Sequence, residues 1–216
     1  MKLLITCTGF SNENLILAAE KALGKSRQNI SVAIINEAYT VENGDKSWAI
    51  REMYNISEIF PKFVDLVDLL GLQKEEVTKR LEAVDLIYIV GGNTEYLMKV
   101  VYESGLDKYL EKTANKLVVG SSAGGMVFCK RPNPKVYGEI FGEYDDYGFE
   151  NYLEYLPDII IPHFGEANFP ELNSSLCSEI AGKYSRKLTC INNKQGILVV
   201  DGLVEYINGE PNYFGA

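Results

Sequence analysis

Residues 116–127 have the sequence KLVVGSSAGGMV, which carries the clearest fold signal in the chain. Its first half, residues 116–120, is an apolar run typical of a buried β-strand, and small residues then lead into an apolar helix. A buried strand that runs directly into a helix is typical of a β-α-β unit, in which parallel strands are joined by crossover helices. This stretch therefore predicts an α/β fold with a mostly parallel sheet and helices on both faces.

The rest of the chain continues the same alternation of apolar runs and amphipathic stretches. From residue 187 onward the apolar runs are separated by short turn sequences, which predicts antiparallel strands at the C-terminal edge of the sheet. We expect one α/β domain over residues 1–216, with further strands at residues 3–8, 31–35, 63–66, 86–90 and 159–162, and helices at residues 12–23, 74–81, 94–104 and 106–112. Residues 37–60 and 131–155 fit no regular element, and long irregular segments of this kind often form sites.

Composition and charge limit the possible functions. The 216 residues are 46% hydrophobic, which is enough for a full core, and their net charge of −9 argues against nucleic acid or an anionic membrane as a partner. The four cysteines lie far apart without a C-x-x-C pair, so we expect reduced thiols and a cytoplasmic location. No apolar run approaches the ~20 residues that cross a bilayer. A single histidine excludes a multi-histidine metal site, so no metal is expected.

The residues between the predicted strand and helix match the G-x-S-x-G pattern of a nucleophile elbow at Gly120, Ser122 and Gly124. Such a turn is so tight that side chains two residues before or after the serine would clash. It would project the Ser122 hydroxyl above the end of the strand and aim the amide of Ala123 at a developing oxyanion. The alternative is that the small residues only let a helix pack closely on a strand or cradle a phosphate.

A second strand-to-helix turn lies upstream at residues 91–94, Gly-Gly-Asn-Thr. In a parallel sheet both turns lie at the same carboxyl edge, where open α/β proteins bind ligands. The amide of Gly92 is therefore a candidate second oxyanion donor, whereas Asn93 and Thr94 are interpreted as the start of a helix.

The lone histidine, His163, follows the strand predicted at residues 159–162. A neutral imidazole there can take the serine proton and return it to a leaving amine, although a lone histidine is more commonly a buried one that bonds a backbone carbonyl. The other ring nitrogen needs an acceptor, and spacing does not choose among the nearby carboxylates, which are Glu139, Glu143, Asp145, Asp146, Glu150, Glu154 and Glu166.

In this order and spacing, residues 91–93, 120–124 and 162–164 resemble the peptidase E group of serine peptidases, which contains aspartyl dipeptidases and their cyanophycinase relatives. The resemblance extends from the first strand to about Gly182. It implies a class I glutamine amidotransferase-like sheet, no cofactor, Ser122 as nucleophile, His163 as base, and the amides of Gly92 and Ala123 as the oxyanion hole. It also implies an acid a little over twenty residues before the histidine, which indicates Glu139 first, then Asp145 or Asp146.

The sequence departs from aspartyl dipeptidases in one respect. Their arginine-bearing stretch after the histidine is replaced here by residues 166–171, Glu-Ala-Asn-Phe-Pro-Glu, which argues against a preference for aspartyl substrates. The leading hypothesis is a serine-type, dipeptidase-like peptidase that takes small peptide substrates. The alternatives are a serine hydrolase acting on another amide or an ester, and a non-enzymatic ligand-binding member of the fold. The sequence leaves open whether the chain forms a homodimer.

Overall fold

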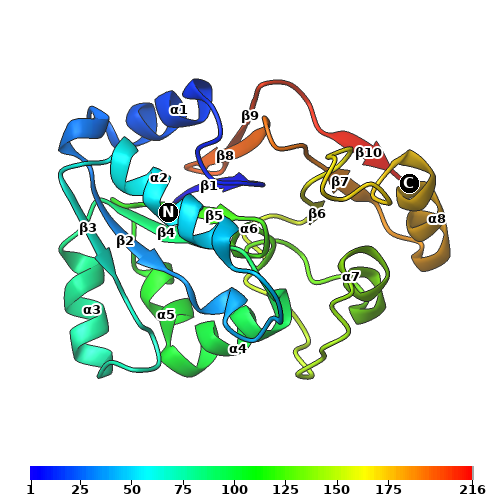
Figure 1. Ribbon diagram of the computed structural model, residues 1–216, viewed down its shortest axis with the longest axis horizontal. Helices are drawn as coiled ribbons and strands as arrows, with labels where there is room; N and C mark the ends of the chain where they lie inside the picture. Colours follow the sequence, from blue (N-terminus) through cyan, green and yellow to red (C-terminus); the bar gives the residue numbers. More distant parts are fainter. Residues whose placement is uncertain (216) are drawn as a thin grey trace.

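The computed structural model describes residues 1–215 and contains a seven-stranded central sheet in the order β3-β2-β4-β5-β1-β8-β9 (Figure 1). The first five strands along the chain are mutually parallel, whereas β8 pairs antiparallel with β1 and β9 pairs antiparallel with β8. The mostly parallel sheet with antiparallel strands at one edge is therefore confirmed. Its strands are β1 (Lys2–Thr6), β2 (Ser31–Ile35), β3 (Phe63–Leu66), β4 (Leu86–Ile89), β5 (Leu117–Ser121), β8 (Gly196–Val200) and β9 (Leu203–Ile207).

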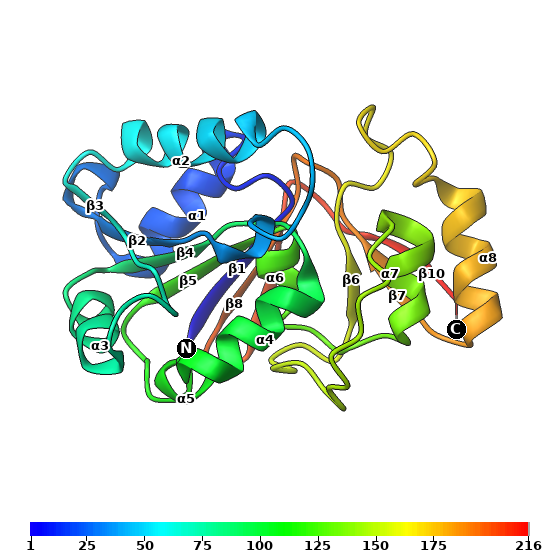
Figure 2. The ribbon, with the colours of Figure 1, turned by 60° about the horizontal axis from the view of Figure 1, so that its bottom comes forward.

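Helices cover both faces of this sheet (Figure 2). One hydrophobic cluster joins α1 and α2 to strand residues such as Leu4, and the other joins α3, α4 and α5 to the alternate positions, such as Leu3 and Ile5. Successive strand side chains point to opposite faces, so each buried strand supplies both clusters. The helices are α1 (Glu13–Leu23), α2 (Ser47–Ile59), α3 (Lys74–Glu82), α4 (Thr94–Ser104) and α5 (Leu106–Glu111), with the short 3-10 turns η1 (Arg27–Asn29) and η2 (Glu37–Tyr39).

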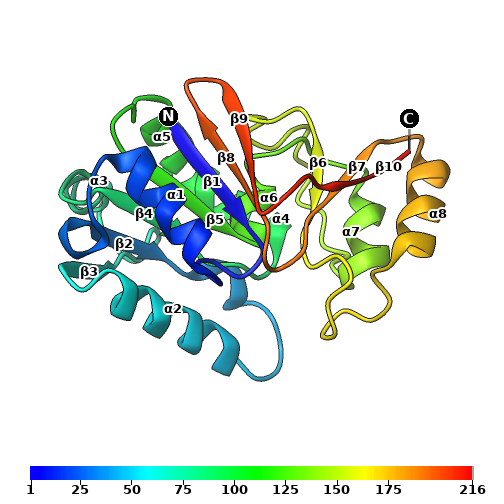
Figure 3. The ribbon, with the colours of Figure 1, turned by 90° about the horizontal axis from the view of Figure 1, so that it is seen from above.

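A second, three-stranded sheet in the order β10-β7-β6 lies beside the central sheet, with two more helices next to it (Figures 1 and 3). It contains β6 (Ile159–Ile161), β7 (Leu188–Cys190) and β10 (Asn212–Phe214), and the helices are α7 (Pro134–Phe141) and α8 (Ser174–Tyr184). The sequence places the strand at residues 159–162 in the central sheet and the run after residue 187 at that sheet's edge. Both placements are wrong for β6 and β7, which pair in parallel with each other, because the edge position beside β1 is taken by β8.

The two segments that the sequence leaves irregular have different structures. Residues 37–60 contain α2, which buries Ala49 and Ile56 against the sheet, so the absence of a regular element there is wrong. Residues 131–155 begin with α7 and continue as a loop. Among residues 1–215, no helix combines the length and apolarity needed to cross a bilayer.

Candidate active site

Ser122 occupies the turn between β5 and the short helix α6 (Ala123–Met126). Its backbone angles, φ 50° and ψ −119°, lie where a residue with a side chain is strained. A Cβ on Gly120 would lie 2.2 Å from the carbonyl oxygen of Gly124, and a Cβ on Gly124 would lie 2.2 Å from that of Ile89. Glycine is therefore required at both positions by the tightness of the turn.

His163 reaches Ser122 from the second sheet. Its Nε2 atom lies 3.0 Å from Ser122 Oγ, within hydrogen-bond distance. The backbone N–H of His163 donates to Cys7 Sγ over 3.3 Å, and its ring stacks on Phe169 with 4.5 Å between the ring centroids. These contacts hold the imidazole with one nitrogen toward the serine hydroxyl.

The other imidazole nitrogen contacts an amide and not a carboxylate. His163 Nδ1 lies 2.9 Å from Asn193 Oδ1, and the backbone N–H of Asn193 donates to Glu166 Oε1 over 2.9 Å. An amide oxygen only accepts, so Nδ1 carries the proton and Nε2 presents a lone pair to Ser122. Because β6 and β7 are parallel, with Ile161 opposite Cys190, the residues just beyond their carboxyl ends meet.

The acid expected from the resemblance does not reach His163. Glu139, on α7, accepts hydrogen bonds from Lys183 Nζ at 2.7 Å and from the Tyr184 hydroxyl, both on α8. Spacing along the chain does not show which way a side chain points, and these two partners hold the Glu139 carboxylate against α8. In the part of the chain that the structure describes, none of the other candidates bonds the His163 ring. Asp145 bonds Asn93, Asp146 bonds Arg131, and Glu143 lines the cavity but bonds the amide of Thr94. Glu166 bonds the amide of Asn193, and Glu150 and Glu154 are exposed.

The two amides expected to form an oxyanion hole lie at the same edge as Ser122. Gly92 has φ 137°, and a Cβ there would lie 2.4 Å from the backbone carbon of Ala38 in η2, so glycine is again required. Within residues 1–215, neither the Gly92 amide nor the Ala123 amide donates to a protein acceptor. Asn93 accepts from the Tyr96 amide over 2.8 Å and caps α4, which is the role that the sequence indicates for it.

A cavity of about 420 Å³ contains these groups. This volume is within the range of roughly 300–1,000 Å³ typical of small-ligand sites. Its lining residues are Cys7, Thr8, Glu42, Trp48, Glu52, Gly92, Ser121, Ser122, Met126, Phe141, Glu143, His163, Asn168, Phe169 and Asn193.

Burial controls the charges of the groups in this cavity. It lowers the pKa of His163 below its usual 6.5, so the imidazole is neutral at pH 7. It raises the pKa of the Cys7 thiol to about 12, so the cysteine beside the histidine is un-ionised. It also raises the pKa of Glu143 to about 7, and those of Glu42 and Glu52 above the usual value.

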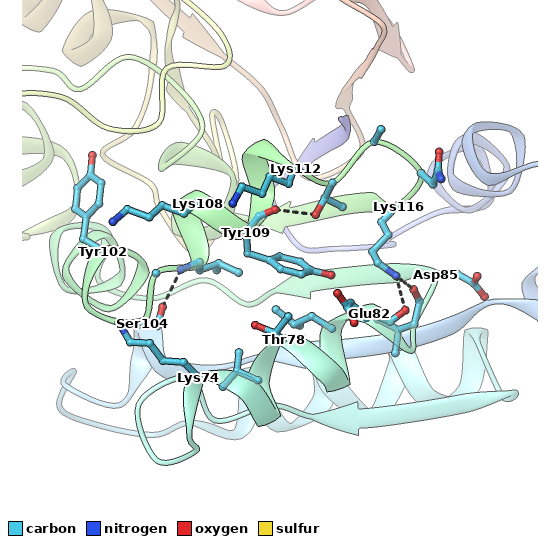
Figure 4. Close-up of a pocket in the computed structure, with 18 residues that line it drawn as sticks. Lys74, Thr78, Glu82, Asp85, Tyr102, Ser104, Lys108, Tyr109, Lys112 and Lys116 are labelled. Carbon is cyan, nitrogen blue, oxygen red and sulfur yellow. Dashed lines mark hydrogen bonds between the residues drawn. The ribbon is translucent and has the colours of Figure 1, made fainter.

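A larger groove of about 680 Å³ lies at the opposite end of the strands, between α3 and α5 (Figure 4). Lysines line it, and one of them, Lys116, donates to the carbonyl oxygen of Glu82 over 2.9 Å. None of the site residues expected from the sequence lies there. Within the part of the chain that the structure describes, His, Cys, Asp and Glu side chains form no cluster of three or more that could hold a metal ion.

Comparisons with known proteins show the family to which the chain belongs. The sequence model of peptidase family S51 matches residues 3–207. The chain belongs to peptidase family S51. Two uncharacterized peptidases, Lmo0363 of Listeria monocytogenes and PM1590 of Pasteurella multocida, are each 27% identical to this S51 peptidase over 176 residues, which are 80% of this chain and 83% and 82% of theirs. The protein is thus a peptidase of a serine peptidase family.

Solved structures support the fold of this S51 peptidase. A candidate peptidase E protein from Listeria monocytogenes EGD-e aligns with a TM-score of 0.74 at 23% identity, covering 95% of this chain and 96% of that one. A peptidase from an acI-B1 Actinobacterium aligns with a TM-score of 0.60 at 15% identity, covering 100% of this chain and 94% of that one. The resemblance to peptidase E and the fold that it implies are confirmed.

Several residues that line the cavity of this S51 peptidase are not predicted from the sequence. Asn193 lies in a turn of polar residues after β7, where no motif distinguishes it. Glu42, Trp48 and Glu52 belong to the segment interpreted as irregular. The signal that would reveal Asn193 is the parallel pairing of β6 with β7, which local sequence patterns do not encode.

Proposed function

We propose that this S51 peptidase hydrolyses short peptides, in the manner of a dipeptidase, through an acyl-enzyme on Ser122. The observation that carries the proposal is the 3.0 Å contact between Ser122 Oγ and His163 Nε2 at a strained strand-to-helix turn. A nucleophile and base within hydrogen-bond reach, with the base oriented by a third group, are typical of covalent hydrolases.

In the first step Ser122 Oγ attacks the carbonyl carbon of the scissile bond while His163 Nε2 takes the hydroxyl proton. The tetrahedral intermediate collapses, the C–N bond breaks, and the imidazolium gives its proton to the leaving amine. In the second step His163 takes a proton from water, the resulting hydroxide attacks the acyl-enzyme, and the peptide's acid product leaves as the proton returns to Ser122. The lowered pKa of His163 favours the neutral base that starts each step.

Asn193 takes the position that the sequence assigns to an acid. Its Oδ1 atom accepts the hydrogen bond from the N–H at His163 Nδ1 and so orients the ring, as the asparagine does in the Cys-His-Asn arrangement of papain-like peptidases. The amides of Gly92 and Ala123 supply the two oxyanion donors, since both lie at the edge that carries Ser122 and both lack a protein acceptor within residues 1–215.

A fluorophosphonate probe tests this proposal without knowledge of the substrate. The folded protein should be labelled at Ser122, and Ser122→Ala should abolish labelling. Ser175→Ala, a change at an exposed serine on α8, serves as a matched control and should be labelled like the wild type. Labelling that persists in Ser122→Ala, or its absence from the folded wild type, would overturn the assignment of Ser122.

A substrate panel then tests the reaction class. Dipeptides and matched esters should be offered to the wild type and to the Ser122→Ala and His163→Ala variants, and both variants should lose hydrolysis. Turnover of esters alone would replace the peptidase proposal by the wider hydrolase hypothesis.

The four buried, free thiols support the cytoplasmic location expected from the sequence, because unpaired cysteines are typical of reducing compartments.

A further inference from the structure

Three glutamates line the cavity beside Ser122. Glu42 lies in the loop before α2, Glu52 lies on α2 itself, and Glu143 follows α7. No lysine or arginine is among the lining residues. The lining thus contains three carboxylates and no cation, and Lys46, which is not a lining residue, only partly offsets the effect of burial on the pKa of Glu42.

The hydrogen bonds of these glutamates leave acceptor capacity free. Glu143 Oε2 accepts from the Thr94 amide over 2.8 Å, and Glu52 Oε1 accepts from the Tyr88 hydroxyl over 2.6 Å. Burial is the main influence on the pKa of the Glu42 carboxylate and the charge of Lys46 the second, and no hydrogen bond to this carboxylate within residues 1–215 contributes. Carboxylates that lose water without gaining a counter-charge are destabilised in their ionised form, and a cation that enters the cavity relieves this cost.

Aromatic side chains complete the lining. Trp48, Phe141 and Phe169 face the same cavity, and Phe169 also stacks on the His163 ring. An ammonium or guanidinium group over an aromatic face is attracted by the ring quadrupole, while the aliphatic stem of a long side chain packs on the rings. Carboxylates combined with aromatics suit a long basic side chain better than a short acidic one.

We propose that this cavity selects short peptides that carry a basic side chain, lysine or arginine, next to the scissile bond. The inference rests on the proposed function, in that Ser122 must be the nucleophile of the same cavity. The α-ammonium group of a dipeptide can pair with one carboxylate, and a second cationic group in the cavity favours the ionised form of another, because it offsets the loss of water around that carboxylate. The residues after His163, 166–171, contain no arginine that would bind an acidic side chain.

The test compares peptides that differ only in side-chain charge. Lys-Ala, norleucine-Ala and Asp-Ala, together with the reversed Ala-Lys, Ala-norleucine and Ala-Asp, have identical termini and separate the basic side chain from its apolar stem. We expect kcat/KM for a lysine peptide to exceed that of its norleucine counterpart by about tenfold or more, as is typical of hydrogen bonds to charged groups. The aspartyl peptides should be the poorest substrates.

Substitutions then locate the selectivity. Glu42→Gln and Glu143→Gln keep the shape of each side chain and remove its charge, so each should reduce the lysine-to-norleucine ratio. Glu58→Gln is the matched control, because Glu58 is exposed on the same helix as Glu52 and does not line the cavity. The ratio should be unchanged in this control.

The outcomes separate the two proposals. If the fluorophosphonate labels Ser122 and norleucine or aspartyl peptides are cleaved as well as lysine peptides, the charge selectivity is wrong and the proposed function stands. If Ser122 is not labelled, both fail. If no peptide of the panel is cleaved, protection of Ser122 from the probe reports binding, and equal protection by lysine and norleucine peptides would overturn the inference.

Discussion

The contact between His163 Nδ1 and Asn193 Oδ1 makes a quantitative prediction. Asn193→Ala leaves the buried N–H of the imidazole without an acceptor, which costs about 1–3 kcal/mol. When this cost is added to the activation free energy of the labelling reaction, the rate of fluorophosphonate labelling at Ser122 should fall by roughly 5- to 160-fold. The loss stays below that of Ser122→Ala or His163→Ala because stacking on Phe169 and the bond from the backbone to Cys7 still hold the ring.

Asn193 also affects how the rate of Ser122 labelling depends on pH. Burial lowers the pKa of His163, and the hydrogen bond to Asn193 opposes that effect, so Asn193→Ala should lower the pKa further. Asn193→Asp places a carboxylate on Nδ1 and should raise the pKa, because an opposite charge favours the imidazolium. Labelling needs the neutral base, so the pH below which the rate declines should move down in the alanine variant and up in the aspartate variant.

The assay is direct because the chain has one histidine. Its imidazole proton resonance reports the pKa of His163 without assignment, and the pH profile of probe labelling reports the activity of the same group. Asn115→Ala, at an exposed asparagine of the groove at the opposite end of the strands, is the control and should change neither. If Asn193→Ala has the wild-type labelling rate and the wild-type His163 pKa, the orienting role of Asn193 is refuted.

Two further predictions concern stability. Arg131 and Glu95 form a buried ion pair at 2.8 Å, with 9% and 4% of their side-chain surfaces exposed. Arg131→Met leaves the buried Glu95 carboxylate without its counter-charge. The free energy of unfolding, measured by urea titration, should therefore fall by about 3–5 kcal/mol. Gly124→Ala drives a Cβ to 2.2 Å from the Ile89 carbonyl oxygen, so it should cost about 1–3 kcal/mol and slow Ser122 labelling by displacing the turn.

Each of these two variants has a matched control in the chain. Arg51→Met, at an exposed arginine on α2, should change the free energy of unfolding by less than about 0.5 kcal/mol. Gly182→Ala, at a position on α8 where a new Cβ meets nothing within 4 Å, should stabilise the protein by about 0.5–1 kcal/mol through helix propensity. Equal stability of Arg131→Met and Arg51→Met, or of the two glycine variants, would contradict the packing argument.

The loop after α7 shows how a charged network positions part of the site. Arg131 also donates to Asp146 over 2.8 Å, and the Tyr152 hydroxyl donates to Glu95 over 2.7 Å. These bonds fasten the segment that carries Glu143 to the start of α4. The sequence shows only a high density of Tyr, Gly, Asp and Glu there, because an ion pair between residues 36 positions apart leaves no local pattern.

The central sheet and the serine turn are predictable from sequence because local rules govern them. Apolar runs of strand length, the helical pattern of residues 12–23 and the glycines around Ser122 each depend on residues close in sequence, and the structure agrees with them. The strand predicted at residues 63–66 coincides with β3, and the helix predicted at residues 94–104 coincides with α4.

Local sequence patterns predict the parallel α/β sheet and the turn that bears Ser122, and the composition leaves a single histidine for any imidazole chemistry. Three features depend on the folded chain: β6 and β7 lie outside the central sheet, Asn193 and not Glu139 contacts His163, and three glutamates line the same cavity. These features differ from the predictable ones in the distance along the chain between the residues that interact. Backbone conformation depends on neighbouring residues, whereas the pairing of β6 with β7 joins residues 29 positions apart and the contact of His163 with Asn193 joins residues 30 positions apart.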